Sequence, residues 1–491
     1  MQQLSGLDTA FLTMEAGGQL GHVGSLCLFE ASGLGDRSLL DAITHTIEHR
    51  LHLLPPYRRR LVEVPFGLDH PYWIEDPDFD LDYHVRHIAV PPPGDETQLA
   101  SLVARIHGHP LDRARPLWEA YVIEGVANDL VGLYTKIHHC TIDGVSGAEM
   151  MTVLLDRARQ GDEVAQRKGP WKVERVPGNA EMLARSVLGL ASQPGRIARV
   201  AARTARDLWR SNEALGALAR GFGFDRLPVA GGWLRRRGPQ VDADPIPQSA
   251  APKTPWNRSI TPHRRFAYFS LPLDEVKRVK NAFGTSLNDA VMAISASALR
   301  RYLREHKALP KDPLVAMVPV SVRSESQRGE YTNRVTSVLG SLATDVDDPV
   351  ERLERIHQAM TSAKRMQQAL PANLLQDWAH VAMPALTAQA ARIVARTRIF
   401  DRLNPPFNVV ISNVPGPRHT LYLGGAELRA YYPVSAVAEG QGLNITVQSY
   451  QDHLDFGLIA CRELVPDLWR FKELFGEGLE ELSKRAAQAT G

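Results

Sequence analysis

The chain of 491 residues carries 57 lysines and arginines and 55 aspartates and glutamates, and 44% of its residues are hydrophobic. These values are typical of a folded protein of two or three domains, and a formal net charge of +2 gives no indication of nucleic-acid binding. The cysteines Cys27, Cys140 and Cys461 lie far apart, which excludes a paired-cysteine zinc or redox motif and fits a reducing cytoplasm.

The N-terminal residues contain neither a basic segment nor a long apolar one, so no secretory signal is predicted. No run of about 18 apolar residues occurs, so no membrane-spanning helix is predicted either. Any contact with lipid is then expected to be peripheral.

The first block of the chain, residues 1–160, mixes strand-like and helix-like segments. The predicted elements are strands over 22–30 and 130–139 and helices over 38–51 and 96–111. Residues 161–261 lack strand-like alternation and end in the proline-rich stretch DADPIPQSAAPKTPW, so they are predicted to be a connector.

Within the connector, the segment from Arg185 to Arg237 has eleven arginines against three acidic residues, with apolar residues at roughly helical spacing. A basic amphipathic helix of this kind suits an anionic membrane surface, where each cation contributes about 1 kcal/mol. The alternative is a helix packed on the protein with its arginines in solvent, and the sequence leaves both open.

Strand-like alternation resumes in the third block, residues 262–491. The predicted elements are strands over 264–273, 314–323, 334–345 and 407–416, a hairpin over 443–461 with its turn near Asp452, and a closing helix over 464–489. The sequence therefore predicts an α/β fold in which two mixed-sheet domains, 1–160 and 262–491, are joined by a long crossover connector.

Two adjacent histidines end the predicted strand over 130–139. Side chains alternate between the two faces of a strand, so His138 and His139 are expected to point in opposite directions if the strand persists that far. This argues against one metal ion bound by both. His139, next to the loop, is expected to enter a cleft, and His138 is left as a supporting or packing residue.

Asp143 and Gly144 follow as a tight turn ahead of a predicted helix. The carboxylate has three candidate roles: it sets the tautomer and basicity of the imidazole, it pairs with an arginine and holds the loop, or it only serves the turn. The residues alone leave these alternatives open.

No nucleophile accompanies His139, because no GxSxG motif is present and Cys140 is expected to face away on the strand. Direct general-base catalysis is therefore favoured over a covalent acyl-enzyme. An imidazole with an ordinary pKa of about 6.5 suits removal of a hydroxyl proton, and a thiol with a pKa of about 8.5 departs with little help. Together these points favour acyl transfer from a thioester to an alcohol.

The segment HHCTIDG matches the HHxxxDG motif of acyl-CoA-dependent acyltransferases and peptide-synthetase condensation domains. Five more segments, in the expected order, resemble the bacterial wax ester synthase/diacylglycerol acyltransferase family. They are RPLWEAYVIEG (115–125), LNDAVMAISASALRRYL (287–303), VPVSVR (318–323), SNVPGP (412–417) and GLNITVQSY (442–450). One departure is Thr332-Asn333-Arg334, where the family commonly has Gly-Asn before a strand.

The resemblance implies two chloramphenicol-acetyltransferase-like domains with a tunnel between them, where acyl-CoA meets diacylglycerol or a fatty alcohol. It implies that His139 is the general base, that Asp143 mainly orients the loop, and that His138 and Gly144 belong to the motif. It also implies no metal, no cofactor besides acyl-CoA as co-substrate and no nucleic-acid partner. The expected location is the cytoplasm, peripheral to the inner membrane face or lipid droplets.

Other residues have a candidate functional role beside a simpler structural one. Asn288 and Asp289 begin a predicted helix and either stabilise an oxyanion or form an ordinary N-terminal cap. Trp118 either packs in the core or contacts substrate. Arg323 either pairs with a carboxylate such as Asp143 and braces the loop, or has no role at the site.

The NVPGP segment, with Asn413 and Gly416, is expected to be a rigid turn after a buried strand or part of the tunnel wall, with Gly416 supplying an unusual backbone angle. The run from Leu374 to Ala395 is apolar enough to be a buried helix pair, and the alternative is a lipid-facing entrance. Two further functions stay open at this point: acyl transfer to a polyketide alcohol or an amine, and a catalytically silent lipid-surface protein.

Overall fold

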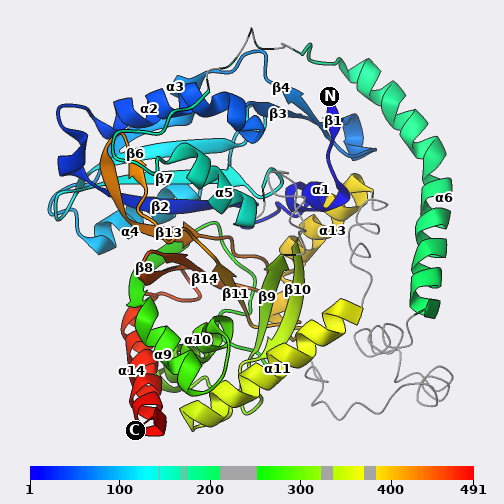
Figure 1. Cartoon of the computed structure of the whole chain (residues 1–491). Helices are drawn as coiled ribbons and strands as arrows, with labels where there is room; N and C mark the ends of the chain where they lie inside the picture. The colour runs from blue at the N-terminus through cyan, green and yellow to red at the C-terminus, as the bar shows by residue number, and fades with distance from the viewer. Residues whose placement is uncertain are drawn as a thin grey trace.

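The computed structural model describes residues 1–142, 144–165, 167, 169, 171, 174–210, 251–321, 335–369 and 383–490. Two six-stranded sheets, in the upper and lower parts of Figure 1, form the body of the molecule, and a three-stranded sheet accompanies them. Both large sheets contain parallel and antiparallel pairs. The predicted α/β fold with two mixed sheets is confirmed.

The first large sheet has the strand order β12-β13-β2-β7-β6-β5. Its strands are β2 (His22–Glu30), β5 (Val85–Ala89), β6 (Trp118–Val126), β7 (Leu130–His138), β12 (Tyr422–Leu423) and β13 (Ala426–Val434). The small sheet, of order β1-β4-β3, contains β1 (Gln2–Gln3), β3 (Arg59–Val62) and β4 (Tyr72–Glu75). The predicted strands over 22–30 and 130–139 are thus confirmed, the second being one residue shorter.

The second large sheet has the strand order β10-β9-β11-β14-β15-β8. Its strands are β8 (Arg264–Pro272), β9 (Val315–Ser321), β10 (Val335–Ser341), β11 (Val409–Val414), β14 (Leu443–Tyr450) and β15 (His453–Cys461). Strands β14 and β15 pair from Tyr450↔His453 onward, which confirms the predicted hairpin and its turn beside Asp452.

Helices flank the sheets, and α6 runs along one side of the molecule away from them (Figure 1). The longer ones are α1 (Gly6–Thr13), α2 (Leu39–Arg50), α4 (Glu96–His107), α5 (Gly144–Leu154), α6 (Asn179–Arg210), α9 (Leu273–Ala282), α10 (Leu287–Glu305), α11 (Pro349–Ala369), α13 (Pro384–Thr397) and α14 (Arg470–Thr490). Short helical turns are η1 (Ala31–Leu34), η2 (Leu51–Leu53), η3 (Pro55–Tyr57), η4 (Pro65–Gly67), α3 (Leu81–His84) and η7 (Ile399–Asp401). None of the helices in the described ranges is long and apolar enough to cross a lipid bilayer.

The closing helix differs from its prediction at its start. We predicted a helix from Leu464, but α14 begins at Arg470. Pro466 explains the difference, because the residue before a proline is driven out of the helical region. The amides of Leu464 and Val465 instead bind the Cys461 carbonyl in a turn.

Two strands from late in the chain complete the first sheet. Strand β13 pairs antiparallel with β2, Tyr431 facing Cys27, although residues 262–491 were predicted as one C-terminal domain. The chain therefore crosses back from the second sheet to the first and returns as β14. The division at residues 160 and 262 stays a prediction, and this exchange of strands is a feature that it did not include.

The two large sheets share a hydrophobic core where β13 crosses β15. Leu26 and Tyr134 of the first sheet pack in one cluster with Phe266 and Tyr268 of β8, beneath α4. The buried Asp455 of β15 accepts the amide hydrogen of Tyr431 at 2.8 Å. The two halves are thus joined by continuous packing and by a hydrogen bond from a backbone amide to a buried carboxylate.

Gly457 allows β15 to pack closely against β13, and replacing this glycine tests how close the two strands are. A Cβ atom at Gly457 would lie 1.7 Å from the Pro433 carbonyl oxygen, so Gly457→Ala must push β13 and β15 apart. We expect a loss of about 2–3 kcal/mol in the free energy of unfolding, measured by denaturant titration.

Gly476→Ala is the matched control, because a methyl group there meets nothing within 4 Å. Since Gly476 lies inside α14, alanine is expected to gain about 0.5–1 kcal/mol at this position. Equal effects of the two replacements would contradict the close crossing.

Candidate active site

A tight turn after β7 presents the two histidines. His138 is the last residue of β7 and pairs with His22 of β2. The His139 amide donates to the Gly21 carbonyl at 2.8 Å, and the Thr141 hydroxyl donates to the His138 carbonyl at 2.6 Å. The turn is therefore held by its own backbone and by the start of β2.

His138 is enclosed, and each of its ring nitrogens lies close to a polar group. The Cys140 amide donates to Nδ1 at 3.1 Å, so Nδ1 is the acceptor and Nε2 carries the hydrogen. Nε2 lies 3.2 Å from Oε1 of Glu15. A Cβ atom at Gly21 would lie 2.6 Å from Nε2, so the His138 ring packs directly against the backbone of Gly21, where a side chain would clash. His138 is thus a support of the turn, the role expected for the histidine that faces away from the cleft.

Glu15, just after α1, was not singled out in the sequence and is central to this support. Its carboxylate accepts the Gly21 amide at 2.7 Å and an Nη2 hydrogen of Arg113 at 2.7 Å. Burial raises the pKa of the Glu15 carboxyl, but His138, Arg113 and the Gly21 amide together lower it to about 2. The carboxylate stays charged and joins α1, β2 and β7.

His139 has different surroundings from His138. It is only partly buried, and its ring stacks on Phe11 of α1 with centroids 4.2 Å apart and planes 21° apart. The neighbouring thiol of Cys140 is fully enclosed, and burial, with the charges of Asp8 and Glu15, raises its pKa well above the usual value. A thiol held neutral in this way is a poor nucleophile.

Two predicted site residues cannot be placed. Asp143 and Arg323 lie outside the described residues, as do residues 332–334. Gly144 was predicted to lie in the turn ahead of the helix, but it is the first residue of α5, which therefore begins one residue earlier than predicted. The proposed pairing between Arg323 and Asp143 stays a prediction.

Asn288 and Asp289 lie in the first turn of α10 and differ in their contacts. Asp289 completes a capping box with Ser286, the N-cap residue of α10. Its carboxylate accepts the Ser286 amide at 3.0 Å and hydroxyl at 2.7 Å, and His357 Nδ1 lies 2.7 Å from the same oxygen. Burial raises the pKa of Asp289, but His357 and Ser286 lower it overall. The Asn288 amide nitrogen and the Thr285 hydroxyl are buried without a hydrogen-bond partner among the described residues. These two groups have hydrogen-bonding capacity left for a ligand.

Trp118 is a core residue. Its ring stacks between Tyr57 and His84, with centroid distances of 4.2 and 4.4 Å, and Nε1 donates to the Tyr57 carbonyl at 2.9 Å. A substrate contact for Trp118 therefore finds no support in its surroundings.

Asn413 and Gly416 lie at the end of β11. Asn413 pairs with Val447 of β14. A Cβ atom at Gly416 would lie 2.0 Å from the Ser449 carbonyl oxygen, whereas its φ lies outside the left-handed region. The expectation of an unusual backbone angle was wrong, because Gly416 is needed for space beside β14.

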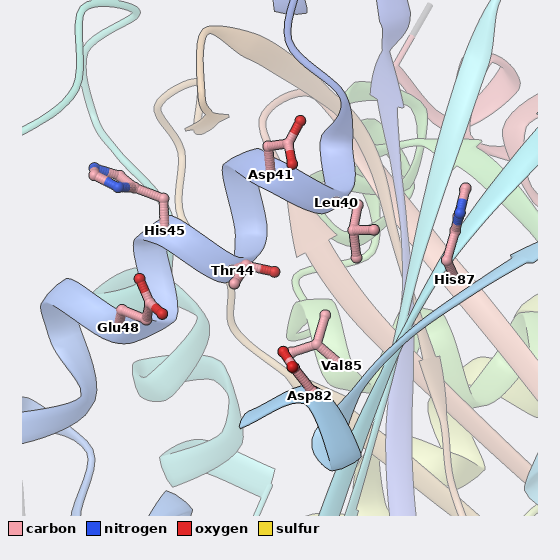
Figure 2. A pocket seen from close by; sticks show the side chains of 8 residues that line it. All are labelled: Leu40, Asp41, Thr44, His45, Glu48, Asp82, Val85 and His87. Carbon is pink, nitrogen blue, oxygen red and sulfur yellow. The ribbon is translucent and has the colours of Figure 1, made fainter. Parts of the chain in front are cut away.

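Two hollows of the described surface lie away from the histidines. One, of about 420 Å³, is lined by α2, α3 and β5, and its side chains, which include His45, Glu48 and His87, are shown in Figure 2. The other, of about 530 Å³, lies around Lys253 and Glu463. Neither includes His139, so the tunnel implied by the resemblance stays a prediction. The described residues contain no group of three or more side chains suited to a metal ion.

Comparison with known proteins covers both halves of the chain. Residues 4–291 match the model of the wax ester synthase/diacylglycerol acyltransferase catalytic domain, and residues 331–483 match the C-terminal domain of the same family. A putative diacylglycerol O-acyltransferase of Mycobacterium tuberculosis is 36% identical over 485 residues, 98% of this chain and 90% of the relative. A probable diacylglycerol O-acyltransferase of the same organism is 36% identical over 489 residues, 97% of this chain and 98% of the relative.

Solved structures agree with this relationship. The wax ester synthase/diacylglycerol acyltransferase from Marinobacter aquaeolei superposes with a TM-score of 0.68 at 32% identity, covering 99% of this chain and all of that one. The first condensation domain of the CDA synthetase gives a TM-score of 0.54 at 16% identity, covering 100% of this chain and 97% of the other. The second likeness shows a shared fold only.

Proposed function

The chain belongs to the wax ester synthase/diacylglycerol acyltransferase family, and from this premise we propose that it transfers a long-chain acyl group from acyl-CoA to a lipid alcohol. The acceptor is diacylglycerol, which gives triacylglycerol, or a fatty alcohol, which gives a wax ester. His139 is the general base.

The observation that carries this proposal is the contrast between the two histidines. His138 is enclosed, accepts a hydrogen bond at Nδ1 and lies against the Glu15 carboxylate at Nε2, whereas His139 is partly exposed and its ring face packs against Phe11. A ring fixed in orientation at the end of a central strand suits a base that meets a substrate.

The proposed reaction proceeds in one acyl transfer. The His139 imidazole takes the proton of the alcohol while the alcohol oxygen attacks the thioester carbonyl carbon. The tetrahedral intermediate then breaks its carbon–sulfur bond, and the imidazolium returns the proton to the departing CoA sulfur. No acyl-enzyme forms, in keeping with the raised pKa of the Cys140 thiol.

The first turn of α10 is proposed to stabilise the oxyanion. The buried amide nitrogen of Asn288 has hydrogens to donate, and a helix N-terminus favours negative charge. Asp289 acts there as a cap that holds the turn. In the same proposal Asp143 orients the loop that carries His139.

The acceptor can be identified with the purified full chain. We expect palmitoyl-CoA to release free CoA thiol when diacylglycerol or hexadecanol is added, with triacylglycerol or wax ester as the matching product. Palmitoyl-CoA without acceptor is the control. Thiol release that does not depend on a lipid alcohol, or transfer to an amine in preference to either alcohol, would refute the proposal.

A further inference from the structure

We propose that the outer face of α13, together with η4, docks on an anionic phospholipid surface. The name "docking face" is used below for Phe66, Leu386, Ile393 and Leu403 with their neighbouring arginines. That the docked lipid supplies the acceptor rests on the proposed function, whereas the docking itself does not.

The docking face gathers exposed apolar side chains from two parts of the chain. Phe66 is 82% exposed, Leu386 65%, and Ile393 and Leu403 each 52%. Helix α13 contacts η4, and a Cβ atom at Gly67 would lie 3.2 Å from the amide nitrogen of Ala385. Leu386 and Ile393, seven residues apart, share one side of α13, Phe66 lies beside its start and Leu403 follows its end. Single exposed leucines are ordinary in proteins, but a row of exposed apolar side chains along one helix indicates an interaction surface.

The solvent-exposed Phe66 has an unfavourable backbone conformation. Its φ of 61° lies in the left-handed region, which disfavours bulky side chains by about 1–2 kcal/mol. Burial in a lipid interface would offset this cost, because a phenylalanine side chain gains about 1.5–3 kcal/mol when fully removed from water.

Arginines outnumber the acidic groups around the docking face, where the partly buried Glu439 also interacts with Arg398. Arg392, Arg396, Arg398 and Arg402 are all exposed. Asp401 is the sole acidic residue between 383 and 406, and it pairs with Arg398 at 2.9 Å. Apolar side chains beside arginines suit an anionic lipid interface, where each cation contributes about 1 kcal/mol.

The docking face lies one helix away from His139. Helix α13 packs on α1, and the Thr387 hydroxyl donates to the Thr13 hydroxyl at 3.2 Å. Figure 1 shows α13 beside α1, and Phe11 of α1 stacks on His139. A lipid alcohol leaving the docked surface would therefore reach the catalytic ring by passing α1.

These observations bear on two expectations from the sequence. The run from Leu374 to Ala395 was predicted as a buried helix pair, but in its described part α13 exposes Leu386 and Ile393, because one face alone packs on α1 and η4. Residues 370–382 lie outside the description. A lipid contact is assigned here to α13 and η4, whereas the arginine-rich segment that includes α6 (Asn179–Arg210) keeps both of its alternatives, since residues 211–237 lie outside the described ranges.

Vesicle sedimentation of the full chain tests the docking. We expect binding to phosphatidylcholine vesicles that contain phosphatidylglycerol, weakened by salt, and much weaker binding to phosphatidylcholine alone.

Replacing Leu386 and Ile393 together by serine should lower the affinity for these vesicles at least about tenfold. Arg392→Glu with Arg396→Glu should lower it more than about tenfold on anionic vesicles only. Leu53→Ser, at a leucine 42% exposed elsewhere, is the matched control.

Phe66→Asn separates docking from folding. Asparagine tolerates the left-handed backbone, so the variant should keep or raise the midpoint of thermal unfolding while it loses vesicle affinity. Unchanged vesicle binding in Phe66→Asn and in the Leu386/Ile393 double variant would overturn the proposal. A dimer of the wild-type chain that dissociates in the double variant would also overturn the proposal. The same holds for binding to neutral-lipid emulsions that contain no anionic lipid.

The docking proposal and the proposed function are tested by independent measurements. Vesicle binding is measured without turnover, and transfer is measured with the alcohol in detergent micelles. If the wild-type chain transfers the acyl group but does not bind vesicles, this inference alone is overturned. If it binds vesicles but does not transfer the acyl group, the proposed function alone is overturned.

Discussion

Replacing His139 by alanine is expected to reduce acyl transfer between about 100-fold and 10,000-fold, the range that a general base contributes. The fall should appear in kcat, measured as CoA thiol released from palmitoyl-CoA in the presence of the preferred alcohol. The fold should remain, because the variant loses one ring stack with Phe11, and such a pair contributes about 0.5–1.5 kcal/mol.

Cys140→Ala is the matched control for this variant. The Cys140 side chain is adjacent in sequence and fully buried, and its backbone amide, which supports His138, is unchanged by the replacement. We expect turnover within a few-fold of wild type. A loss in Cys140→Ala equal to that in His139→Ala would indicate a covalent route through the thiol, and substantial turnover in His139→Ala would remove the assigned base.

Local patterns in the sequence predict much of this molecule. Alternation gives β2, β7 and the hairpin of β14 and β15 almost to the residue, because each strand is buried on at least one face and its side chains follow a period of two. The different environments of His138 and His139 were predicted from the same period, but β7 ends at His138, and His139 owes its environment to the turn that follows. Trp118 packs in the core, as its size and apolar neighbours suggest.

Features that depend on contacts between distant segments could not be predicted. Glu15 meets His138 and Arg113 across long stretches of chain, and nothing in the sequence around Glu15 indicates those partners. The pairing of β13 with β2 is equally non-local. The exposure of Leu386 was missed for a related reason: an apolar helix is expected to be buried, and only its neighbours decide which face is covered.

Replacing Glu15 by alanine is expected to destabilise the protein and to disturb catalysis. The carboxylate is 14% exposed and is the shared partner of His138 and Arg113. Its loss removes the carboxylate that lies 3.2 Å from the buried Nε2 of His138 and that pairs with Arg113, at a cost of roughly 3 kcal/mol in the free energy of unfolding. Denaturant titration at neutral pH measures this difference.

The effect of Glu15 on stability should depend on pH with a definite sign. The folded-state pKa of about 2 lies below the ordinary value of 4.5. A depressed pKa means that the contribution is complete above pH 4.5 and is lost as the pH falls from 4.5 towards 2. The difference in unfolding free energy between wild type and Glu15→Gln should therefore shrink over that interval. A difference that stayed constant would contradict a charged Glu15 in the folded state.

Glu15→Gln also tests whether this residue positions the catalytic turn. Glutamine keeps the shape but not the charge, so the turn at His138 should loosen and misplace His139. A displacement at the reacting centre lowers kcat, here by about tenfold or more, with little change in KM. Glu63→Gln is the matched control, because Glu63 binds the same Arg113 at 3.0 Å and is more exposed. If both variants lose kcat equally, Glu15 acts through Arg113 alone. A loss confined to Glu15→Gln supports the route through His138 and the Gly21 amide, the two contacts that Glu63 does not share.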